Sequence, residues 1–254
     1  MCGIGGFVDY EHDTRGYGPV AERMKRTLAP RGPDAEGQFC DLDAMLVHRR
    51  LIVIDPDGGQ QPMTSSDGNT VLIYNGELYN TEDIRHELIL RGHRFAGHSD
   101  TEVVLHAFLE WGTDAFPRLN GIFAFAIWQK AERRLTLCRD RLGVKPLFLA
   151  HTGGGLVFGS TIGTVLCHPE VEPVIDEDGL RSLLLLGPAR PPASGVFRQI
   201  DSLLPGHYAI LTPEHYTDAA YWKLEAHEHP DDLEATIERT RELICDAAQR
   251  QLVS

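Results

Sequence analysis

A chain of 254 residues is long enough for one large domain, or for one domain with an appendage, and for a substantial hydrophobic core. Its formal net charge of −13 argues against general nucleic-acid binding, which needs a basic surface. No apolar run approaches the length of a membrane span, and the N-terminus has neither the basic nor the apolar region of a signal peptide.

The predicted elements are rich in strands. The strands are apolar runs at residues 3–9, 44–54, 70–74, 122–128, 135–138, 146–150, 156–158 and 207–211, and three glycines at 153–155 predict a hairpin. The helices repeat apolar residues at helical spacing over 18–28, 81–91 with Thr81 as its cap, a segment starting at Ser99 or Asp100, 178–186 and 230–253. This order predicts layered sheets with helices on their faces and argues against a Rossmann-type alternation.

Cys2 is the first candidate for chemistry. Methionine aminopeptidases remove Met1 when the next side chain is small, which would leave a thiol and a free α-amino group on one residue. Since an α-amino group has a pKa of about 7.7–8.0 and a thiol one of about 8.5, the amine can act as the base that deprotonates the thiol. A Met-Cys start is not specific by itself, so the interpretation depends on the rest of the chain.

Four further segments carry polar groups next to apolar ones, and each has a plain structural alternative. Arg50 ends a paired-arginine segment and could bind a carboxylate or face solvent. Asn75 and Gly76 could form an oxyanion hole or a simple turn. Asp100 could receive an ammonium group or cap a helix. The segment at 31–34, Arg-Gly-Pro-Asp, is interpreted as a turn.

Together these groups describe a site for one kind of substrate. A thiol nucleophile, an oxyanion hole, a cation and an anion suit a free α-amino acid that carries a reactive carbonyl in its side chain. Glutamine fits that description.

The chain resembles the glutaminase domain of glutamine-dependent asparagine synthetases, which are class II glutamine amidotransferases of the N-terminal-nucleophile hydrolase family. The resemblance covers nearly the whole chain, in order and at family spacing. Its motifs are MCGIGGF, RGPD, HRRLIVID, GQQP, YNGELYN, SDTE, GIFAFAIW, RDRLGVKPL and LLPGH. It implies an α+β fold, a four-layer αββα sandwich of two antiparallel sheets flanked by helices.

The resemblance also implies roles for individual residues. Cys2 would be the nucleophile that forms a γ-glutamyl thioester and releases ammonia, with Asn75 and the Gly76 amide as its oxyanion hole. The expected glutamine-binding residues are Arg50, Leu51, Ile52, Val53, Ile54, Asn75, Gly76, Glu77 and Asp100. Arg50 would hold the α-carboxylate, Glu77 and Asp100 would contact the α-amino end, and the backbone of Ile52 and Val53 would line the pocket.

In the family a second, synthetase domain receives the ammonia and uses ATP to amidate a carboxylate, usually aspartate. We expect residues 1–210 to form the amidotransferase domain and 211–254 a linker and helix leading toward a synthetase domain that this sequence does not contain. ATP and Mg²⁺ are expected only in that missing half, and no cofactor in this one. The expected partners are L-glutamine and the synthetase half, and a homodimer is left open.

Two other functions remain open at this point. The chain could be a catalytically silent module that docks a synthetase, or another N-terminal-cysteine amidase. The five cysteines are scattered without a CxxC pair, which is typical of a reducing cytosol, so a cytoplasmic location is expected. The twelve histidines show no ligand spacing, and no metal is expected.

Overall fold

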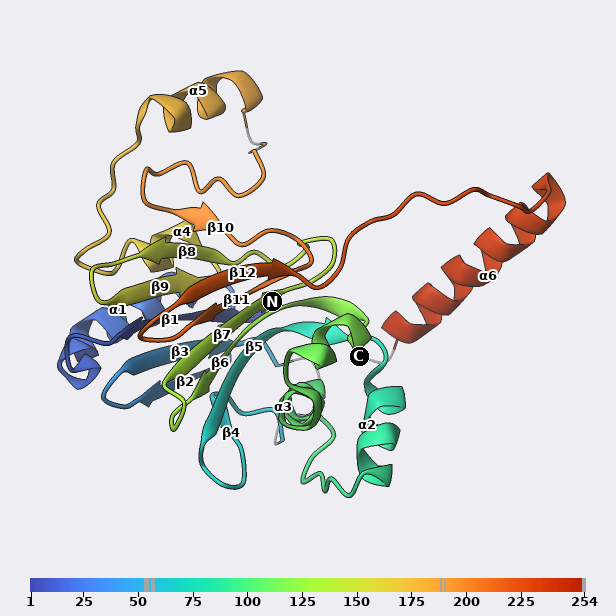
Figure 1. Cartoon of the computed structure of the whole chain (residues 1–254), viewed down its shortest axis with the longest axis horizontal. Helices are drawn as coiled ribbons and strands as arrows, with labels where there is room; N and C mark the ends of the chain where they lie inside the picture. Colours follow the sequence, from blue (N-terminus) through green and yellow to red (C-terminus); the bar gives the residue numbers. More distant parts are fainter. Residues whose placement is uncertain (53–54, 56–57, 188, 190, 253–254) are drawn as a thin grey trace.

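The computed structural model describes residues 1–52, 55, 58–187, 189 and 191–252. Its strands form two six-stranded antiparallel sheets (Figure 1). The first sheet has the order β10-β8-β9-β1-β3-β2, with bounds β1 (Gly3–Asp9), β2 (Ala35–Cys40), β3 (Ala44–Arg50), β8 (Phe148–His151), β9 (Gly155–Gly159) and β10 (Asp201–Ser202). The second has the order β12-β11-β7-β6-β5-β4, with bounds β4 (Met63–Thr64), β5 (Thr70–Leu78), β6 (Gly121–Gln129), β7 (Arg134–Arg139), β11 (His207–Leu211) and β12 (Tyr216–Ala220).

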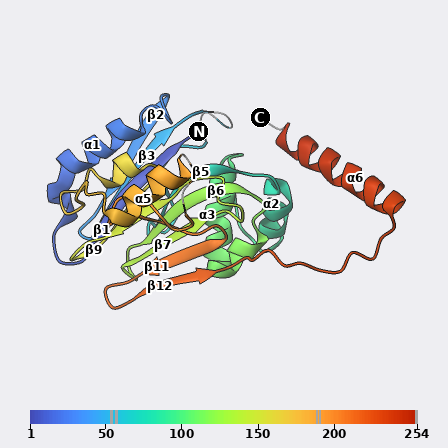
Figure 2. The same cartoon turned by 90° about the horizontal axis from the view of Figure 1, so that it is seen from above.

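Helices cover the outer faces of both sheets. Helices α1 (Gly18–Leu28) and α4 (Ile162–Val165) pack on the first sheet, and α2 (Thr81–Leu90) and α3 (Asp100–Trp111) pack on the second (Figure 2). Two 3₁₀ segments, Thr14–Tyr17 and Gly112–Arg118, precede α1 and follow α3. The structure confirms the predicted α+β arrangement of two antiparallel sheets between helical layers.

Three apolar clusters hold these layers together, and strand alternation assigns residues to them. On β5, Val71 and Ile73 belong to the cluster between the sheets, whereas Leu72 points to the cluster beneath α2 and α3. On β1, Ile4 lies between the sheets and Phe7 packs toward α1. Because side chains alternate along a strand, every second residue is directed into the space between the sheets.

Several predicted boundaries differ from the observed ones. The strand predicted over 44–54 ends at Arg50, and residues 53 and 54 lie outside the described part of the chain. The strand predicted over 70–74 continues to Leu78, so the turn interpretation of Asn75-Gly76 is wrong; both residues pair with β6. Of the two residues predicted as possible caps of α3, Ser99 is the cap, because its side chain accepts a hydrogen bond from the Glu102 amide.

Helix α2 begins without the predicted threonine cap. The residue before it, Asn80, makes no side-chain capping bond, and the Thr81 hydroxyl instead donates to the Leu78 carbonyl. The hydroxyl therefore ties the helix back to the end of β5 rather than satisfying the first amides of the helix.

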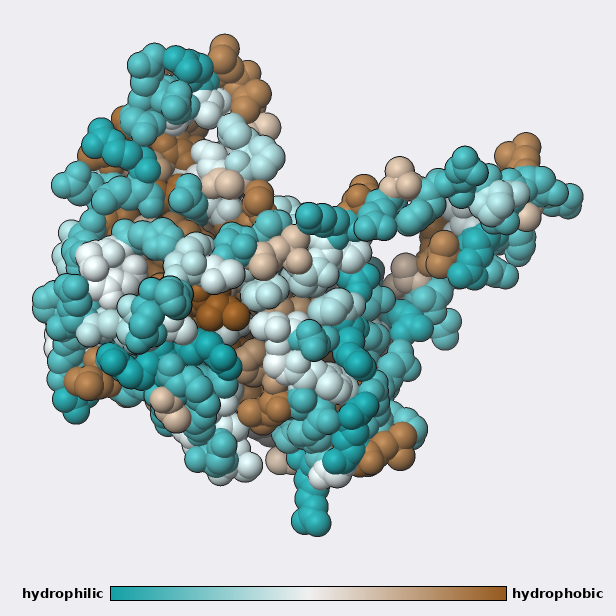
Figure 3. All heavy atoms as spheres, in the orientation of Figure 1, coloured by the Kyte–Doolittle hydropathy of each residue, from teal (hydrophilic) through white to brown (hydrophobic). Residues whose placement is uncertain are grey.

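Two helices stand away from the sandwich. Helix α5 (Glu177–Leu186) exposes several leucines, and α6 (Leu233–Gln251) has no buried residue among those described. Figure 3 shows apolar atoms gathered at α5 and scattered among polar ones along α6. The predicted domain boundary at 210 falls inside β11, and β12 pairs with that strand after it. Within the described residues, no helix combines the length and apolar character that a membrane crossing requires.

Candidate active site

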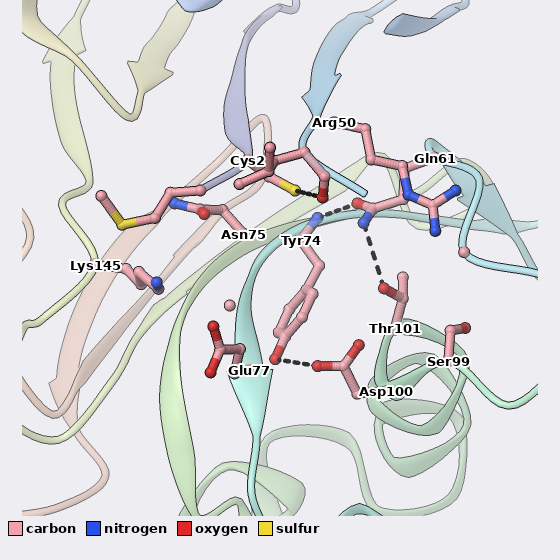
Figure 4. A pocket seen from close by; sticks show the side chains of 14 residues that line it. Cys2, Arg50, Gln61, Tyr74, Asn75, Glu77, Ser99, Asp100, Thr101 and Lys145 are labelled. Carbon is pink, nitrogen blue, oxygen red and sulfur yellow. Dashed lines mark hydrogen bonds between the residues drawn. The ribbon is translucent and has the colours of Figure 1, made fainter. Parts of the chain in front are cut away.

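The polar residues of the site lie at one end of the core between the sheets. Side chains two residues apart on a strand point to the same face of the sheet. Ile4, Leu46 and Ile73 point into the core between the sheets. Cys2, Arg50 and Asn75 are separated from them by an even number of residues and therefore point to the same space. They surround a cavity of about 240 Å³ (Figure 4). The described lining residues are Met1, Cys2, Arg50, Leu51, Gly59, Gln61, Tyr74, Asn75, Gly76, Glu77, Ser99, Asp100, Thr101 and Lys145.

Cys2 is half-buried at the start of β1. Its Sγ lies 3.7 Å from the Leu51 carbonyl oxygen, and its own carbonyl accepts a 3.0 Å hydrogen bond from Arg31 Nε. Burial raises the pKa of the Cys2 thiol, while the positive charges of the chain terminus and Arg50 oppose that effect. The thiol therefore needs a nearby base or additional positive charge to become a thiolate near neutral pH.

Asn75 carries an unpartnered amide on the wall of this cavity. The residue is 1% exposed, and neither Nδ2 nor Oδ1 has a hydrogen-bond partner among the described residues. Buried amides are almost always paired, because an unmade hydrogen bond costs about 1–3 kcal/mol. The Asn75 amide is thus available to a ligand that enters the cavity next to Cys2.

Gly76 follows Asn75 and lets the two strands approach closely. A Cβ at this position would lie 2.6 Å from the Ile122 carbonyl oxygen and 2.6 Å from Phe123 Cβ. A larger residue would push β5 away from β6 and displace the Asn75 amide with it.

Arg50 supplies a buried cation at the opposite wall. It is 6% exposed, and one guanidinium nitrogen donates a 2.6 Å hydrogen bond to the Asp55 carbonyl. A Cβ on Gly59 would lie 2.3 Å from that nitrogen, so a larger residue there would force the guanidinium to shift. The adjacent Arg49 points to the other face of β3 and pairs with Glu36, as strand alternation requires.

Asp100 supplies an acidic group in the first turn of α3. Its Oδ2 accepts hydrogen bonds from the Tyr74 hydroxyl and the Leu78 amide, both at 3.1 Å. Burial raises the pKa of the Asp100 carboxyl, and the two hydrogen bonds oppose that effect. Because Ser99 provides the helix cap, Asp100 remains free to face the cavity, as does Glu77 on β5.

Not every predicted residue lines this cavity. Leu51 does, through the segment that follows β3. Ile52 instead donates its amide to Asp34 Oδ2 at 2.8 Å and belongs to a neighbouring cavity. Val53 and Ile54 lie outside the described residues, and the binding roles of all four residues at 51–54 stay predictions.

Sequence reasoning missed three residues that the fold brings here. Arg31, interpreted as part of a turn, holds the Cys2 carbonyl. Gln61 accepts a 2.6 Å hydrogen bond from the Tyr74 amide and donates one of 3.3 Å to Thr101 Oγ1, so it braces β5 against α3. Lys145 enters from the loop after β7. All three lie in family motifs, namely RGPD, GQQP and RDRLGVKPL, whose presence was the available signal.

The arrangement combines four chemical capacities around one small space. A thiol can attack a carbonyl, an unpaired amide can bind the resulting oxyanion, a cation can bind a carboxylate, and carboxylates can bind an ammonium group. The cavity is smaller than the roughly 300–1,000 Å³ of sites for drug-sized ligands, so a single amino acid is the appropriate size of substrate.

A family model described as "Glutamine amidotransferase domain" matches residues 1–222. The chain belongs to the glutamine amidotransferase domain family. It is 43% identical to "Asparagine synthetase [glutamine-hydrolyzing] 3" of Bacillus subtilis (strain 168), covering 100% of this chain and 42% of that protein. It is 32% identical to "Asparagine synthetase [glutamine-hydrolyzing] 2" of the same organism, covering 100% of this chain and 36% of the relative. The predicted family resemblance is confirmed, and the chain spans about two fifths of these relatives.

A solved amidotransferase shares the fold. Glutamine phosphoribosylpyrophosphate amidotransferase from B. subtilis superposes with a TM-score of 0.61 at 16% identity, over 87% of this chain and 49% of that one. At this identity the similarity concerns the arrangement of sheets and helices.

Proposed function

We propose that this glutamine amidotransferase domain hydrolyses L-glutamine to glutamate and ammonia, with Cys2 as the nucleophile. The observation that carries the proposal is the unpartnered Asn75 amide, buried in the cavity that Cys2 also lines. The substrate assignment is supported by Arg50, Asp100 and Glu77, a cation and two carboxylates that line the same cavity. The residue roles that the sequence predicts are kept in this proposal.

The first half of the reaction forms a thioester. After removal of Met1, the α-amino group of Cys2 accepts the thiol proton, and the sulfur attacks the amide carbon of glutamine. The Asn75 amide and the Gly76 N–H stabilise the oxyanion. When the carbon–nitrogen bond breaks, the α-ammonium group returns a proton to the leaving amine, which departs as ammonia.

Water completes the reaction. The α-amino group takes a proton from a water molecule as its oxygen attacks the thioester carbonyl, and the thiolate leaves and is reprotonated. Arg50 holds the α-carboxylate and Asp100 with Glu77 holds the α-ammonium group throughout, and glutamate is free to leave once water has cleaved the thioester bond to Cys2.

A synthetase half is the proposed recipient of the ammonia. The names of the relatives and the limited share of their length that this chain covers support this partner. In that half, ATP and Mg²⁺ would activate a carboxylate, aspartate or a specialised acceptor, for amidation. The glutaminase half is proposed to need no cofactor and to act in the cytoplasm.

Intact-protein mass spectrometry with 6-diazo-5-oxo-L-norleucine, together with an ammonia assay, tests the glutaminase. We expect loss of Met1, one adduct on Cys2, and glutamine-dependent ammonia release. Cys2→Ala should lose both the adduct and the activity, while Cys245→Ala, which removes an exposed thiol on α6, should keep them. Ammonia release by Cys2→Ala would contradict the mechanism. A retained Met1, or an unreactive Cys2, would favour the silent docking module instead.

A further inference from the structure

Lys145 is a buried lysine that the mechanism above does not use. It belongs to the loop between β7 and β8, is 4% exposed, and lines the cavity with Cys2 and Glu77. Figure 4 shows its amino group on the side of the cavity where Asn75 and Glu77 lie, away from Arg50. A cation therefore faces the nucleophile from the side opposite the expected carboxylate-binding arginine.

The loop fixes the backbone on both sides of this lysine. The buried Asp140 accepts hydrogen bonds of 2.9 Å from the amides of Val144 and Lys145. Arg139 Nε donates a 2.8 Å hydrogen bond to the Lys145 carbonyl. The neighbouring Val144 is exposed, so the loop directs the lysine alone into the cavity. These hydrogen bonds fix the backbone of Lys145, so its side chain enters the cavity from one defined position.

Among the described residues, the lysine ion pairs belong to Lys25, and Lys145 has no carboxylate within ion-pair distance. Burial lowers the pKa of the Lys145 ammonium and Arg31 adds to that effect, while Glu77 and Asp140 oppose it. An incompletely paired buried charge is unfavourable for folding, and such groups concentrate at functional sites.

Charges of both signs face the chain terminus. The Cys2 thiolate and Glu77 on β5 favour the ammonium form, whereas Lys145 and Arg31, from the segment after α1, favour the neutral amine. Burial is the largest effect and lowers the pKa of the terminal amine of Met1. Arg50 on β3 favours the thiolate of the next residue, and Asp100 on α3 opposes it.

Of the cations around the nucleophile, Arg31 is bound to the Cys2 carbonyl and Arg50 to the Asp55 carbonyl. Lys145 differs from both arginines, because its side chain lines the cavity and makes no such hydrogen bond to a carbonyl among the described contacts. We propose that Lys145 is a positioning residue of the glutaminase, whose buried positive charge keeps the terminal amine of Cys2 unprotonated and favours the thiolate. This proposal rests on the proposed function, because the terminal amine exists on Cys2 only after Met1 is removed.

The test is the pH dependence of Cys2 alkylation by iodoacetamide, followed on the N-terminal peptide by mass spectrometry. Lys145→Met should move the midpoint of the alkylation profile to higher pH by about 0.5–1 unit. Lys145→Arg should retain most of the original midpoint. Lys223→Met, which removes an exposed lysine outside the cavity, is the matched control and should match the unmodified protein.

An unshifted midpoint in folded Lys145→Met, checked by circular dichroism, would overturn the proposal. Lys145→Gln provides the same test if the methionine variant does not fold. An equal shift in Lys223→Met would also overturn it, because the effect would then belong to net charge. Iodoacetamide needs no glutamine turnover, so a shifted profile in a protein that releases no ammonia would contradict the proposed function and leave the electrostatic role of Lys145 supported.

Discussion

Asn75 keeps its amide buried and unpaired, although most buried amides are satisfied within the protein. The fold tolerates this arrangement because β5 and β6 are paired on both sides of the residue. If the amide stabilises an oxyanion, it lowers the barrier of the reaction and contributes little to the free energy of folding. Activity and stability should therefore respond differently to its removal.

We predict that Asn75→Ala lowers kcat for glutamine hydrolysis by about 100–1,000-fold, as removal of an oxyanion donor does elsewhere. The free energy of unfolding should change little, because no described hydrogen bond is lost. Steady-state ammonia release and urea unfolding measure the two effects. A variant that is strongly destabilised, or one that retains activity, would assign the amide a structural role instead.

Arg50→Ala should mainly weaken glutamine binding, because the guanidinium would pair with the substrate carboxylate. A charge-assisted hydrogen bond is worth about 1.5–3 kcal/mol, which corresponds to a rise in KM of about 10- to 150-fold. Arg50→Lys should restore only part of this, since it cannot make a bidentate contact. An unchanged KM in Arg50→Ala would remove the residue from its assigned role.

At the residue scale the sequence predicted what lies in short motifs. Cys2, Arg50, Asn75 and Asp100 were identified and do meet at one cavity. Lys145 was missed, although it lies in the motif RDRLGVKPL, because the motif does not indicate that the loop between β7 and β8 brings this side chain to the cavity of Cys2.

At the scale of elements, β3 and β5 face each other and bring polar groups into the space between the sheets. His48 on β3 bridges them, with Nε2 lying 3.2 Å from the Tyr74 carbonyl. A carbonyl only accepts, so the neutral ring donates through Nε2. Burial lowers the pKa of His48 to about 4.

His48 should make the protein sensitive to mild acid. In the unfolded chain His48 binds a proton near pH 6.5, whereas in the folded chain it does so only near pH 4. Protonation between these values therefore favours the unfolded chain, so the free energy of unfolding is unaffected above pH 6.5 and decreases as the pH drops toward 4. The contribution lost reaches about 3 kcal/mol. Urea unfolding at pH 7 and pH 5 should show a smaller loss for His48→Gln than for the unmodified chain. Equal losses would show that other groups titrate.

Strand lengths were harder to predict than strand positions. Asn75-Gly76 has the composition of a turn, yet pairing with β6 along its whole length keeps β5 extended through both residues. Strand β2 was missed because its sequence, Ala-Glu-Gly-Gln-Phe-Cys, has no continuous apolar run. It lies exposed at a sheet edge, where pairing with one neighbouring strand is enough. Tertiary pairing thus outweighed local preference in both cases.

At the scale of the whole molecule, α6 meets the sandwich near its C-terminal end, where Arg250 Nη1 lies 3.4 Å from Asp83 Oδ2 on α2, and it adds nothing to the described core. The family match ends at 222, and α6 has no buried residue among those described. Tyr221, just before the linker, donates a 2.8 Å hydrogen bond to the Arg139 carbonyl and so belongs to the sandwich. The predicted boundary at 210 can be tested against this contact.

A chain ending at Lys223 should unfold within about 2 °C of the full chain and keep its glutaminase activity, because the packed core is intact. A chain ending at Leu211 loses β12 and the Tyr221 contact, and should unfold at lower temperature. Calorimetry of both forms makes the comparison. If the shorter chain were as stable as the longer one, the boundary near 210 would be supported.

The position of β1 sets how the protein can be handled and matured. This strand lies between β9 and β3, so the nucleophile is held at the start of a central strand. Met1, which precedes it, is 57% exposed. An aminopeptidase could therefore trim the already folded protein, and maturation would resemble the activation of a zymogen by a single cut. A purification tag ahead of Met1 would block that step, whereas a fusion after α6 would leave it open.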